Sequence, residues 1–351
     1  MSLGESNFRQ LNRPEEWDQK IRPQSLDEFV GQDRLVDNLR IALEAAKLRK
    51  EPSDHVLLSG LPGLGKTTLC QLISREMGAG LTTTSGPALT RAADLAGILT
   101  GLGEGDVLFI DEAHRLPAAV EEYLYSAMED FVVDIPVDQG LGARSVRLSL
   151  QPFTLVAATT REGLLTPPFR GRFGIREKLV PYPTDDLVQI LRRTARLLDI
   201  EIEDGAAKDV AERSRGTPRI ANRLLRRLRD LAQVRQEACV NAAVAEEGLE
   251  RLGIDGHGLE ETDRRILGLL FRAGVPLGIK TIAAGIGESE DAIEEVYEPH
   301  LLRLEFIRKT SRGRELTRMG RSWCEASPNV ATASRQGPPR DSQGRLWQKE
   351  I

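Results

Sequence analysis

A glycine-rich stretch followed by a lysine and a threonine stands where an apolar run gives way to a helical pattern. Residues 60–67 read Gly-Leu-Pro-Gly-Leu-Gly-Lys-Thr, which is the spacing of a phosphate-binding loop. Glycines let consecutive backbone N–H groups turn around an anion, and the helix that follows adds the positive end of its dipole. We expect Lys66 to reach the β- and γ-phosphates of ATP and the Thr67 hydroxyl to ligate Mg²⁺.

An acidic pair follows a second apolar run. Residues 106–110 are typical of a fully buried parallel strand, and Asp111 and Glu112 come directly after them. The carboxyl ends of such strands face the ligand crevice of a parallel sheet. We therefore expect Asp111 to hold Mg²⁺ and Glu112 to polarise the water that attacks the γ-phosphorus.

Two threonines follow a third strand-like run at 153–158. Taken alone, Thr159 and Thr160 could form an ordinary turn or helix cap. Because their strand comes third in the order of phosphate loop, acidic strand and polar strand, we assign one of them to positioning the attacking water. Thr160 is the candidate, and the spacing does not decide between it and Thr159.

The composition is that of a globular chain without a membrane segment. The 351 residues allow two or three domains, with 40% hydrophobic and 29% charged side chains. No apolar run approaches the roughly 18 residues of a membrane span, and the N-terminus lacks the apolar core of a secretory signal. Cys70, Cys239 and Cys324 lie far apart, which argues against a zinc site or a disulfide framework and favours a cytoplasmic location.

Positive charge is concentrated in two segments, although the net charge is −5. Residues 213–229 contain seven arginines and no acid, and residues 308–321 contain five arginines and a lysine against one glutamate. Charge runs are usually solvated faces, so each needs a local reason before it indicates a nucleic-acid site.

The chain divides by pattern into five parts. Residues 1–20 form a polar tail, and residues 21–183 alternate strands with helices, which predicts an α/β domain with a parallel sheet. Residues 184–254 are helical throughout and predict a small lid. Residues 255–325 read as three helices and a hairpin with a basic tip, the pattern of a winged helix. Residues 326–351 are rich in Ser, Pro, Gln and Gly and predict a disordered tail.

A β-hairpin insert is expected near residues 132–150. Apolar residues alternate there around a glycine-containing turn at 138–142. Pro136 limits its strand to an edge, which suits a projecting hairpin. A protruding apolar hairpin is an aggregation hazard unless a partner covers it, so we expect a protein partner.

These motifs resemble, in order and spacing, the RuvB family of bacterial AAA+ motors that drive Holliday-junction branch migration. The shared stretches are Arg22-Pro23 with 26–32, then 63–69, 108–116, 153–155, 158–161, 172–175 and 215–227. The resemblance implies an AAA+ P-loop NTPase domain, a helical lid and a C-terminal winged helix. It also implies ATP and Mg²⁺ as cofactors, a homohexamer, double-stranded DNA at Holliday junctions, and RuvA and RuvC as partners, with no membrane involved.

The same resemblance implies roles for single residues. Arg172 would be an arginine finger that reaches the γ-phosphate of a neighbouring subunit, with Arg170 as a possible assistant. Arg219 would be a lid sensor of the γ-phosphate. The implied nucleotide-binding residues are Arg22, Leu26, Phe29, Val30, Gly63, Leu64, Gly65, Lys66, Thr67, Thr68, Arg172, Tyr182 and Arg219. Val30 and Ile220 fit an adenine pocket or a plain core equally well, and Arg22 could contact the nucleotide or only brace the strand.

Contacts with DNA and with a partner are also implied. Arg312 and Arg314 would contact phosphates at the tip of the wing, because branch migration must ignore base sequence. Val146 and Leu148 of the hairpin insert fall where the family docks on RuvA.

Two other functions share parts of this pattern. A clamp loader or helicase loader would have the same ATP site, but the wing after the lid and the hairpin insert argue against it. A non-catalytic, ATP-gated DNA-binding regulator would dispense with Glu112 or Arg172, and both residues are present.

Overall fold

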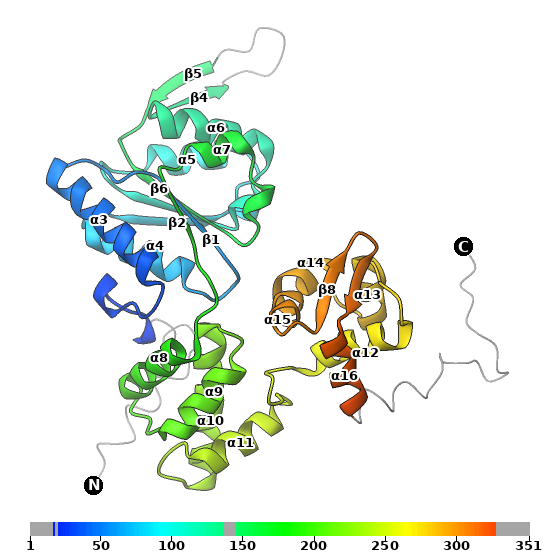
Figure 1. Ribbon diagram of the computed structural model, residues 1–351. Coiled ribbons are helices and arrows are strands. Elements are labelled where there is room, and N and C mark those ends of the chain that lie inside the picture. The colour runs from blue at the N-terminus through cyan, green and yellow to red at the C-terminus, as the bar shows by residue number, and fades with distance from the viewer. Residues whose placement is uncertain (1–16, 18–19, 137–144, 328–351) are drawn as a thin grey trace. The chain divides into compact units, whose positions relative to one another are not determined.

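Five parallel strands form the central sheet in the order β2-β3-β6-β1-β7 (Figure 1). Their bounds are β1 (Val56–Ser59), β2 (Leu81–Ser85), β3 (Val107–Asp111), β6 (Thr154–Thr159) and β7 (Ile175–Lys178). The computed structural model describes residue 17, residues 20–136 and residues 145–327. The chain splits into two compact units, Met1–Asn241 and Ala242–Ile351, which are described in turn.

Helices cover both faces of this sheet. On one face lie α3 (Asp33–Arg49) and α4 (Lys66–Met77), and on the other lie α5 (Ala92–Thr100), α6 (Ala118–Glu129) and α7 (Pro167–Gly171) (Figure 1). Leu57, Leu108 and Leu155 of three neighbouring strands pack in one core cluster with residues of α5 and α6. Burial on both faces explains why β1 and β6 are buried at every residue.

Strand ends place the chemistry at one edge of the sheet. β1 pairs with β6 so that Ser59 is opposite Thr159, and the phosphate loop leaves the sheet directly after Ser59. Asp111 is the last residue of β3. The predicted strands 106–110 and 153–158 are therefore confirmed, each displaced by one residue.

Three helices of the lid complete the first unit: α8 (Thr184–Leu197), α9 (Asp204–Arg213) and α10 (Pro218–Arg235). Proline is the first residue of α10, where its missing N–H costs nothing. Leu187 and Leu191 of α8 and Leu224 and Leu228 of α10 are buried, which gives the lid its own apolar packing.

The hairpin insert forms a separate two-stranded antiparallel sheet of β4 (Val132–Pro136) and β5 (Ser145–Ser149). Val133 lies opposite Leu148 and Asp134 opposite Arg147. The predicted turn at 138–142 lies outside the described residues, as do almost all of the predicted tails at 1–20 and 326–351.

The second unit begins with α11 (Ala242–Arg251) and continues as a winged helix. Its elements are α12 (Glu261–Ala273), α13 (Ile279–Ile286), α14 (Glu290–Ala292), a π-helical turn (Ile293–Tyr297), α15 (Glu298–Arg303), β8 (Ile307–Thr310), β9 (Gly313–Leu316) and α16 (Arg318–Ala326). Ile266, Ile282, Leu301 and Phe306 belong to its core. The three predicted helices and the hairpin are present, whereas α16 has no counterpart in the sequence analysis.

None of the helices among the described residues is long and apolar enough to cross a membrane.

Candidate functional site

A cavity of about 420 Å³ opens beside the phosphate loop in the first unit. Its volume lies in the range of small-molecule and cofactor sites. Most of the sequence-predicted nucleotide and catalytic residues line it: Arg22, Phe29, Val30, Gly63, Leu64, Gly65, Lys66, Thr67, Thr68, Asp111, Glu112, Thr160, Tyr182 and Arg219. Residues separated by up to about 200 positions therefore meet around one space.

The phosphate loop is held in its binding shape by glycines with positive φ. Gly63 has φ +79°, and a Cβ there would lie 2.8 Å from Thr217 Cγ2 and 3.0 Å from Arg219 Cβ. Gly65 has φ +110° and immediately precedes α4. A side chain at either glycine would be strained, and one at Gly63 would also push the lid away from the loop.

The lysine of the loop is already placed for a phosphate. Lys66 Nζ donates to the carbonyl oxygens of Gly60 (2.7 Å) and Leu61 (3.0 Å), and the residue is buried at the first position of α4. Both carbonyls belong to the loop, so the ammonium lies across it. A polyphosphate in the loop would meet this charge together with the helix N-terminus.

The acidic pair combines a strand end with an uncommon backbone conformation. Glu112 has φ +53°, in the left-handed region, and its N–H donates to Asp111 Oδ1 at 2.9 Å. Glu112 Oε2 also lies 3.5 Å from Arg115 Nη1. Non-glycine residues in this region are sparse and gather at functional sites.

The donor set fits a magnesium ion held jointly with a nucleotide. Thr67 supplies one hydroxyl and Asp111 one carboxylate to the cavity. Magnesium is typically bound by one or two such protein ligands plus phosphate oxygens and waters. In keeping with this, no group of three or more His, Cys, Asp and Glu side chains among the described residues forms a dedicated metal cage.

The two threonines at the end of β6, Thr159 within the strand and Thr160 directly after it, have different surroundings. Thr159 is buried at 1% exposure, its hydroxyl lies 3.0 Å from His114 Nδ1, and it accepts from the Arg161 N–H. Thr160 lines the cavity, and its buried hydroxyl has no hydrogen-bond partner among the described residues. This geometry supports Thr160 as the residue that positions water.

Tyr182, just before the lid, and Arg219 of the lid contact the phosphate loop directly. The Tyr182 hydroxyl donates to the Leu64 carbonyl at 3.1 Å, and burial raises the pKa of this phenol well above its usual range. The Arg219 N–H donates to the Gly63 carbonyl at 3.4 Å. The phosphate loop therefore contacts Tyr182 just before the lid and Arg219 at the start of α10. A change in the conformation of the loop can be transmitted to the lid through these two contacts.

For several residues the sequence left open whether they line the nucleotide pocket or only pack behind it, and the structure distinguishes the two cases. Val30 and Arg22 line the cavity, which supports the nucleotide-pocket reading for both. Leu26 is buried at 4% exposure and is not among the lining residues, so its place is in the packing behind the wall. Ile220 is half-buried and does not line the cavity either.

Several lining residues were not found by sequence reasoning. They are Trp17, Glu28, Ile190, Arg193, Thr194 and Asn222. Trp17 is 2% exposed and packs with Ile21 and Leu198, so the lone aromatic residue in a polar stretch was the available signal. Residues on α8 and α10 gave no signal beyond their helical periodicity.

Arg172 is the C-cap residue of α7 and is not among the residues that line the cavity. Its Nη2 is 3.1 Å from Glu129 Oε2, and its Nη1 donates to the Pro168 carbonyl at 2.8 Å. Its guanidinium carbon is 4.2 Å from the centre of the Tyr125 ring. Such a position supports a role at another subunit's nucleotide rather than its own.

A polar cluster around buried Glu121 supports the helix that leads to Arg172. Thr166 is the N-cap of α7 and accepts from the Phe169 N–H at 3.3 Å. The Thr166 hydroxyl also donates to Glu121, and the Tyr125 hydroxyl donates to Glu121 Oε1 at 2.6 Å. Glu121 thus fixes both the helix cap and the ring on which Arg172 lies.

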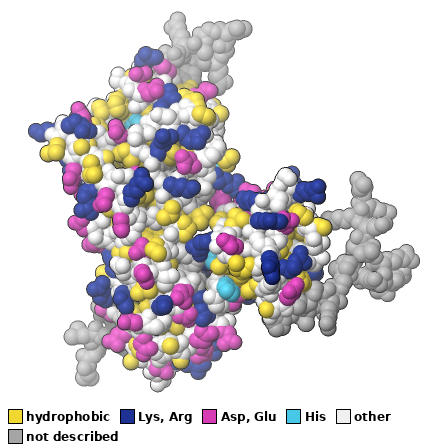
Figure 2. All heavy atoms as spheres, viewed as in Figure 1, with side chains coloured by type: hydrophobic (Ala, Val, Ile, Leu, Met, Phe, Trp, Pro, Cys, Tyr) yellow, Lys and Arg dark blue, Asp and Glu magenta, His cyan; other side chains and the backbone are white. Residues whose placement is uncertain are grey.

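The wing presents one of its two predicted arginines. Arg312 is exposed in the turn between β8 and β9. Arg314 is only 13% exposed and forms ion pairs with Glu294 and Glu298, both at 2.8 Å. Figure 2 shows Lys and Arg side chains beside hydrophobic ones over the visible face of this unit. The charge of Arg314 is balanced within the domain, because Glu294 of the π-helical turn and Glu298 of α15 are both acidic.

The two predicted partner residues share one face of the hairpin insert. Leu148 is half-buried against the core of the large domain, whereas Val146 is 48% exposed. Arg147 points to the opposite face and pairs with Asp134 through two bonds of 3.0 Å. The apolar face therefore continues outward from the core to an exposed valine.

Three family models match successive parts of the chain. Residues 21–179 match the Holliday junction DNA helicase RuvB P-loop domain, residues 182–255 the RuvB AAA lid domain, and residues 256–325 the RuvB C-terminal winged helix domain. These spans follow the sheet domain, the lid helices together with α11, and the winged helix of the structure.

Similar proteins agree with the family models. The chain is 53% identical over 305 residues to a Holliday junction branch migration complex subunit RuvB of Chlorobaculum parvum, covering 86% of this chain and 89% of the relative. It is 54% identical over 308 residues to the RuvB of Bdellovibrio bacteriovorus, covering 87% and 94%. The solved Thermotoga maritima RuvB branch migration motor superposes with a TM-score of 0.80 at 48% identity, covering 87% and 98%. The chain belongs to the RuvB family.

Proposed function

We propose that this protein is an ATP-driven motor that moves the branch point of Holliday junctions by translocating duplex DNA through a hexameric ring. One observation carries the proposal: the phosphate loop, the acidic pair and the Thr160 hydroxyl converge on one cavity. The names of its relatives, which are subunits of branch migration complexes, supply the DNA substrate.

The cavity residues divide the work of hydrolysis among them. Bound MgATP supplies the γ-phosphoryl group and the cation that shields its charge. Lys66 would bind the β- and γ-phosphate oxygens, and Thr67 and Asp111 would hold the magnesium. Glu112 would accept a proton from the attacking water while Thr160 orients that water.

We infer that the site is completed by a second subunit. Arg172 does not line the cavity of its own subunit, and its side chain is held by Tyr125 and Glu129. In a ring, this guanidinium would neutralise charge on the neighbour's γ-phosphate in the transition state. Arg219, at the first turn of the lid helix α10, would sense whether that phosphate is present.

The winged helix would contact DNA through its wing, the hairpin of β8 and β9, rather than through the helical stretch from α14 to α15. That helical stretch carries Glu290, Asp291, Glu294, Glu295 and Glu298. Negative side chains there would repel phosphates, whereas exposed Arg312 attracts them. Phosphate contacts carry no base information, which suits a motor that must pass any sequence.

The hairpin insert would dock on RuvA through Val146, with Leu148 fixing the hairpin on the core. RuvC would join the same assembly when junctions are resolved. We place the protein in the cytoplasm, where junction DNA is available.

The proposal is tested with a synthetic four-way junction. The protein should dissociate the junction only with ATP and RuvA, while Glu112→Gln should bind ATP and lose about a hundredfold or more in hydrolysis. ATP hydrolysis on linear duplex without junction dissociation, where an established RuvB motor works, would instead indicate a loader or a regulator. Normal hydrolysis by Glu112→Gln would remove the role given to that carboxylate.

A further inference from the structure

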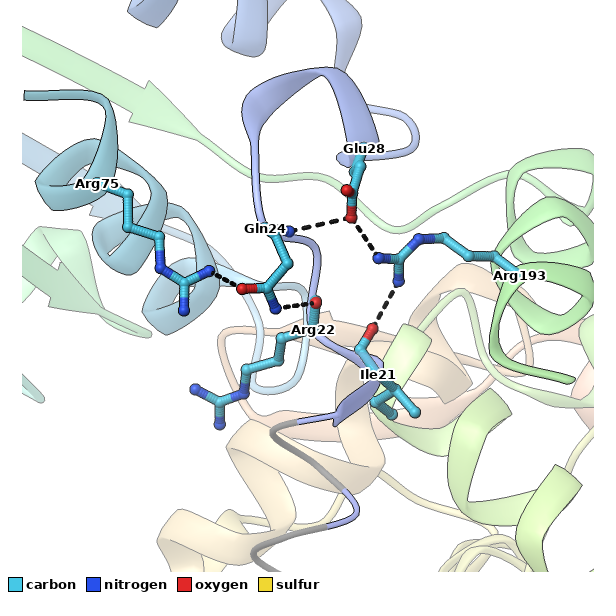
Figure 3. A network of polar contacts seen from close by, with 6 residues as sticks. All are labelled: Ile21, Arg22, Gln24, Glu28, Arg75 and Arg193. Atoms are coloured by element: carbon cyan, nitrogen blue, oxygen red, sulfur yellow. Dashed lines mark hydrogen bonds and ion pairs between the residues drawn. The ribbon is translucent and has the colours of Figure 1, made fainter. Parts of the chain in front are cut away.

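One arginine of the lid grips a short segment of chain at both of its ends. Arg193 of α8 donates through Nη1 to the Ile21 carbonyl and through Nη2 to Glu28 Oε2, both at 2.6 Å (Figure 3). We call residues 21–28 the strap. Its two ends meet on a single guanidinium, so Arg193 closes the strap into a loop.

The strap is also tied to the helix that follows the phosphate loop. Arg75 of α4 donates to Gln24 Oε1 at 2.5 Å, and Gln24 Nε2 donates to the Arg22 carbonyl at 2.9 Å (Figure 3). The Gln24 N–H donates to the Glu28 carboxylate at 3.1 Å. This N–H and the Arg193 guanidinium lower the pKa of Glu28, which keeps the carboxylate charged.

The strap forms part of the cavity wall. Arg22 and Pro23 lie inside the strap, Phe29 follows it directly, and all three line the cavity together with Arg193. The phosphate-binding residues Lys66 and Thr67 come instead from the loop and the start of α4. The wall held by Arg193 and the groups that bind phosphate therefore come from different segments of the chain.

We propose that Arg193 is a positioning residue for the adenosine half of the nucleotide: it holds the strap so that Arg22, Pro23 and Phe29 form a ready-made wall. This inference rests on the nucleotide site proposed above. Arg193 acts through the strap, so its loss affects the affinity for the nucleoside and leaves phosphate binding intact.

The exposure of the pair argues for this role over a purely structural one. The Arg193 side chain is 21% exposed and that of Glu28 is 44% exposed. Ion pairs of this kind contribute little to the stability of a fold. Their loss does release the strap, and ordering it again upon binding costs affinity, which is the general penalty of lost preorganisation.

The test compares two ligands on three proteins by isothermal titration calorimetry. The ligands are MgADP and magnesium tripolyphosphate, which has phosphates but no adenosine. Arg193→Gln should bind MgADP about three- to tenfold more weakly and tripolyphosphate as tightly as the unsubstituted chain. Arg192→Gln is the matched control, since Arg192 is the preceding residue of α8 and pairs with Asp204 at 2.6 Å instead.

A second variant, Glu28→Gln, tests whether Glu28 and Arg193 act through the same strap. Glu28→Gln should weaken MgADP by a smaller factor, because Arg193 keeps its bond to the Ile21 carbonyl. The double variant should be no weaker than Arg193→Gln alone, since both changes release the same strap. Equal thermal unfolding midpoints would show that the fold is kept.

Three outcomes would overturn the inference. Unchanged MgADP binding by Arg193→Gln would show that the contacts of Arg193 with the strap do not contribute to nucleotide affinity. An equal loss for both ligands in Arg193→Gln, with Arg192→Gln unaffected, would show a general effect on the lid. If the unsubstituted chain bound neither ligand, the proposed nucleotide site itself would be wrong, and the inference would fall with it.

Discussion

The guanidinium of Arg172 lies 4.2 Å from the centre of the Tyr125 ring, and the hydroxyl of that ring is bonded to buried Glu121. Cation–π contacts of this kind hold a guanidinium in place, and here Nη1 also donates to the Pro168 carbonyl while Nη2 pairs with Glu129. Tyr125 therefore fixes the direction of the side chain that we assign to a neighbouring subunit's nucleotide.

Replacing Tyr125 by alanine should lower ATP hydrolysis by assembled rings about tenfold without changing ATP affinity, because the finger loses its support. Tyr125→Phe keeps the ring and should retain most of the activity. Steady-state hydrolysis and nucleotide binding, measured on both variants, check this. Equal losses in the two variants would show that the hydroxyl, rather than the ring, matters.

Action in trans can be tested by mixing subunits. Arg172→Ala lacks the finger and Lys66→Ala lacks a working phosphate loop, so each should be inactive alone. Mixed rings contain interfaces that join an intact finger to an intact loop, and hydrolysis should partly return. Verified mixed rings that stay inactive would count against a finger that crosses the interface.

Replacement by valine should have opposite effects at the two threonines at the end of β6. Thr160→Val removes a hydroxyl without a partner among the described residues, so stability should change little while hydrolysis falls about ten- to a hundredfold. Thr159→Val breaks the contact with His114 and should cost about 1–2 kcal/mol of unfolding free energy. Urea unfolding and ATPase rates decide, and the reverse pattern would make Thr159 the sensor.

The two arginines of the wing should also separate. Arg312→Ala should weaken DNA binding and reduce the salt dependence of the affinity by about one counterion. Arg314→Ala should instead destabilise the winged helix by about 1–3 kcal/mol, because nearly buried Glu298 loses one of its two cationic partners and is left with Lys309. Salt titrations and thermal unfolding of both variants check this. A purely DNA-binding defect in Arg314→Ala would mean that its ion pairs open on DNA.

Buried His55 should make stability depend on pH. Burial lowers its pKa below 6.5, so the unfolded chain takes up a proton at a pH where the folded chain does not. The free energy of unfolding should therefore fall as the pH drops below about 6.5, by up to about 1.4 kcal/mol per unit. Urea unfolding at pH 7.5 and 5.5 measures this slope. His55→Gln should show a flatter slope, and an identical slope would assign the dependence to other groups.

The parts of the site that depend on neighbouring residues could be predicted from the sequence. The phosphate loop is recognised because its glycines, its lysine and the strand end before it lie within about ten residues of each other. The acidic pair is recognised because it comes at the end of an apolar strand. The grip of Arg193 on Glu28 joins positions 165 residues apart, and no periodicity encodes such a pairing.

Two features of the winged helix depend on contacts that the local sequence does not show. Arg314 lies in a basic run and stays a predicted DNA contact, while Glu298 and Glu294, 16 and 20 residues earlier in the chain, form ion pairs with it. Helix α16 was missed because it is short and contains Gly320. A Cβ at that glycine would lie 2.0 Å from the Phe306 carbonyl oxygen, so close packing rather than helix propensity determines the residue.

The position of Arg172 outside its own cavity has a consequence for the isolated subunit. A single chain would carry a nucleotide and a finger that cannot meet, so dilution should abolish turnover before it abolishes nucleotide binding. The rate per chain should then rise with protein concentration until rings are complete. Unassembled subunits in the cell would bind ATP without hydrolysing it, and hydrolysis would begin only when the ring assembles on DNA.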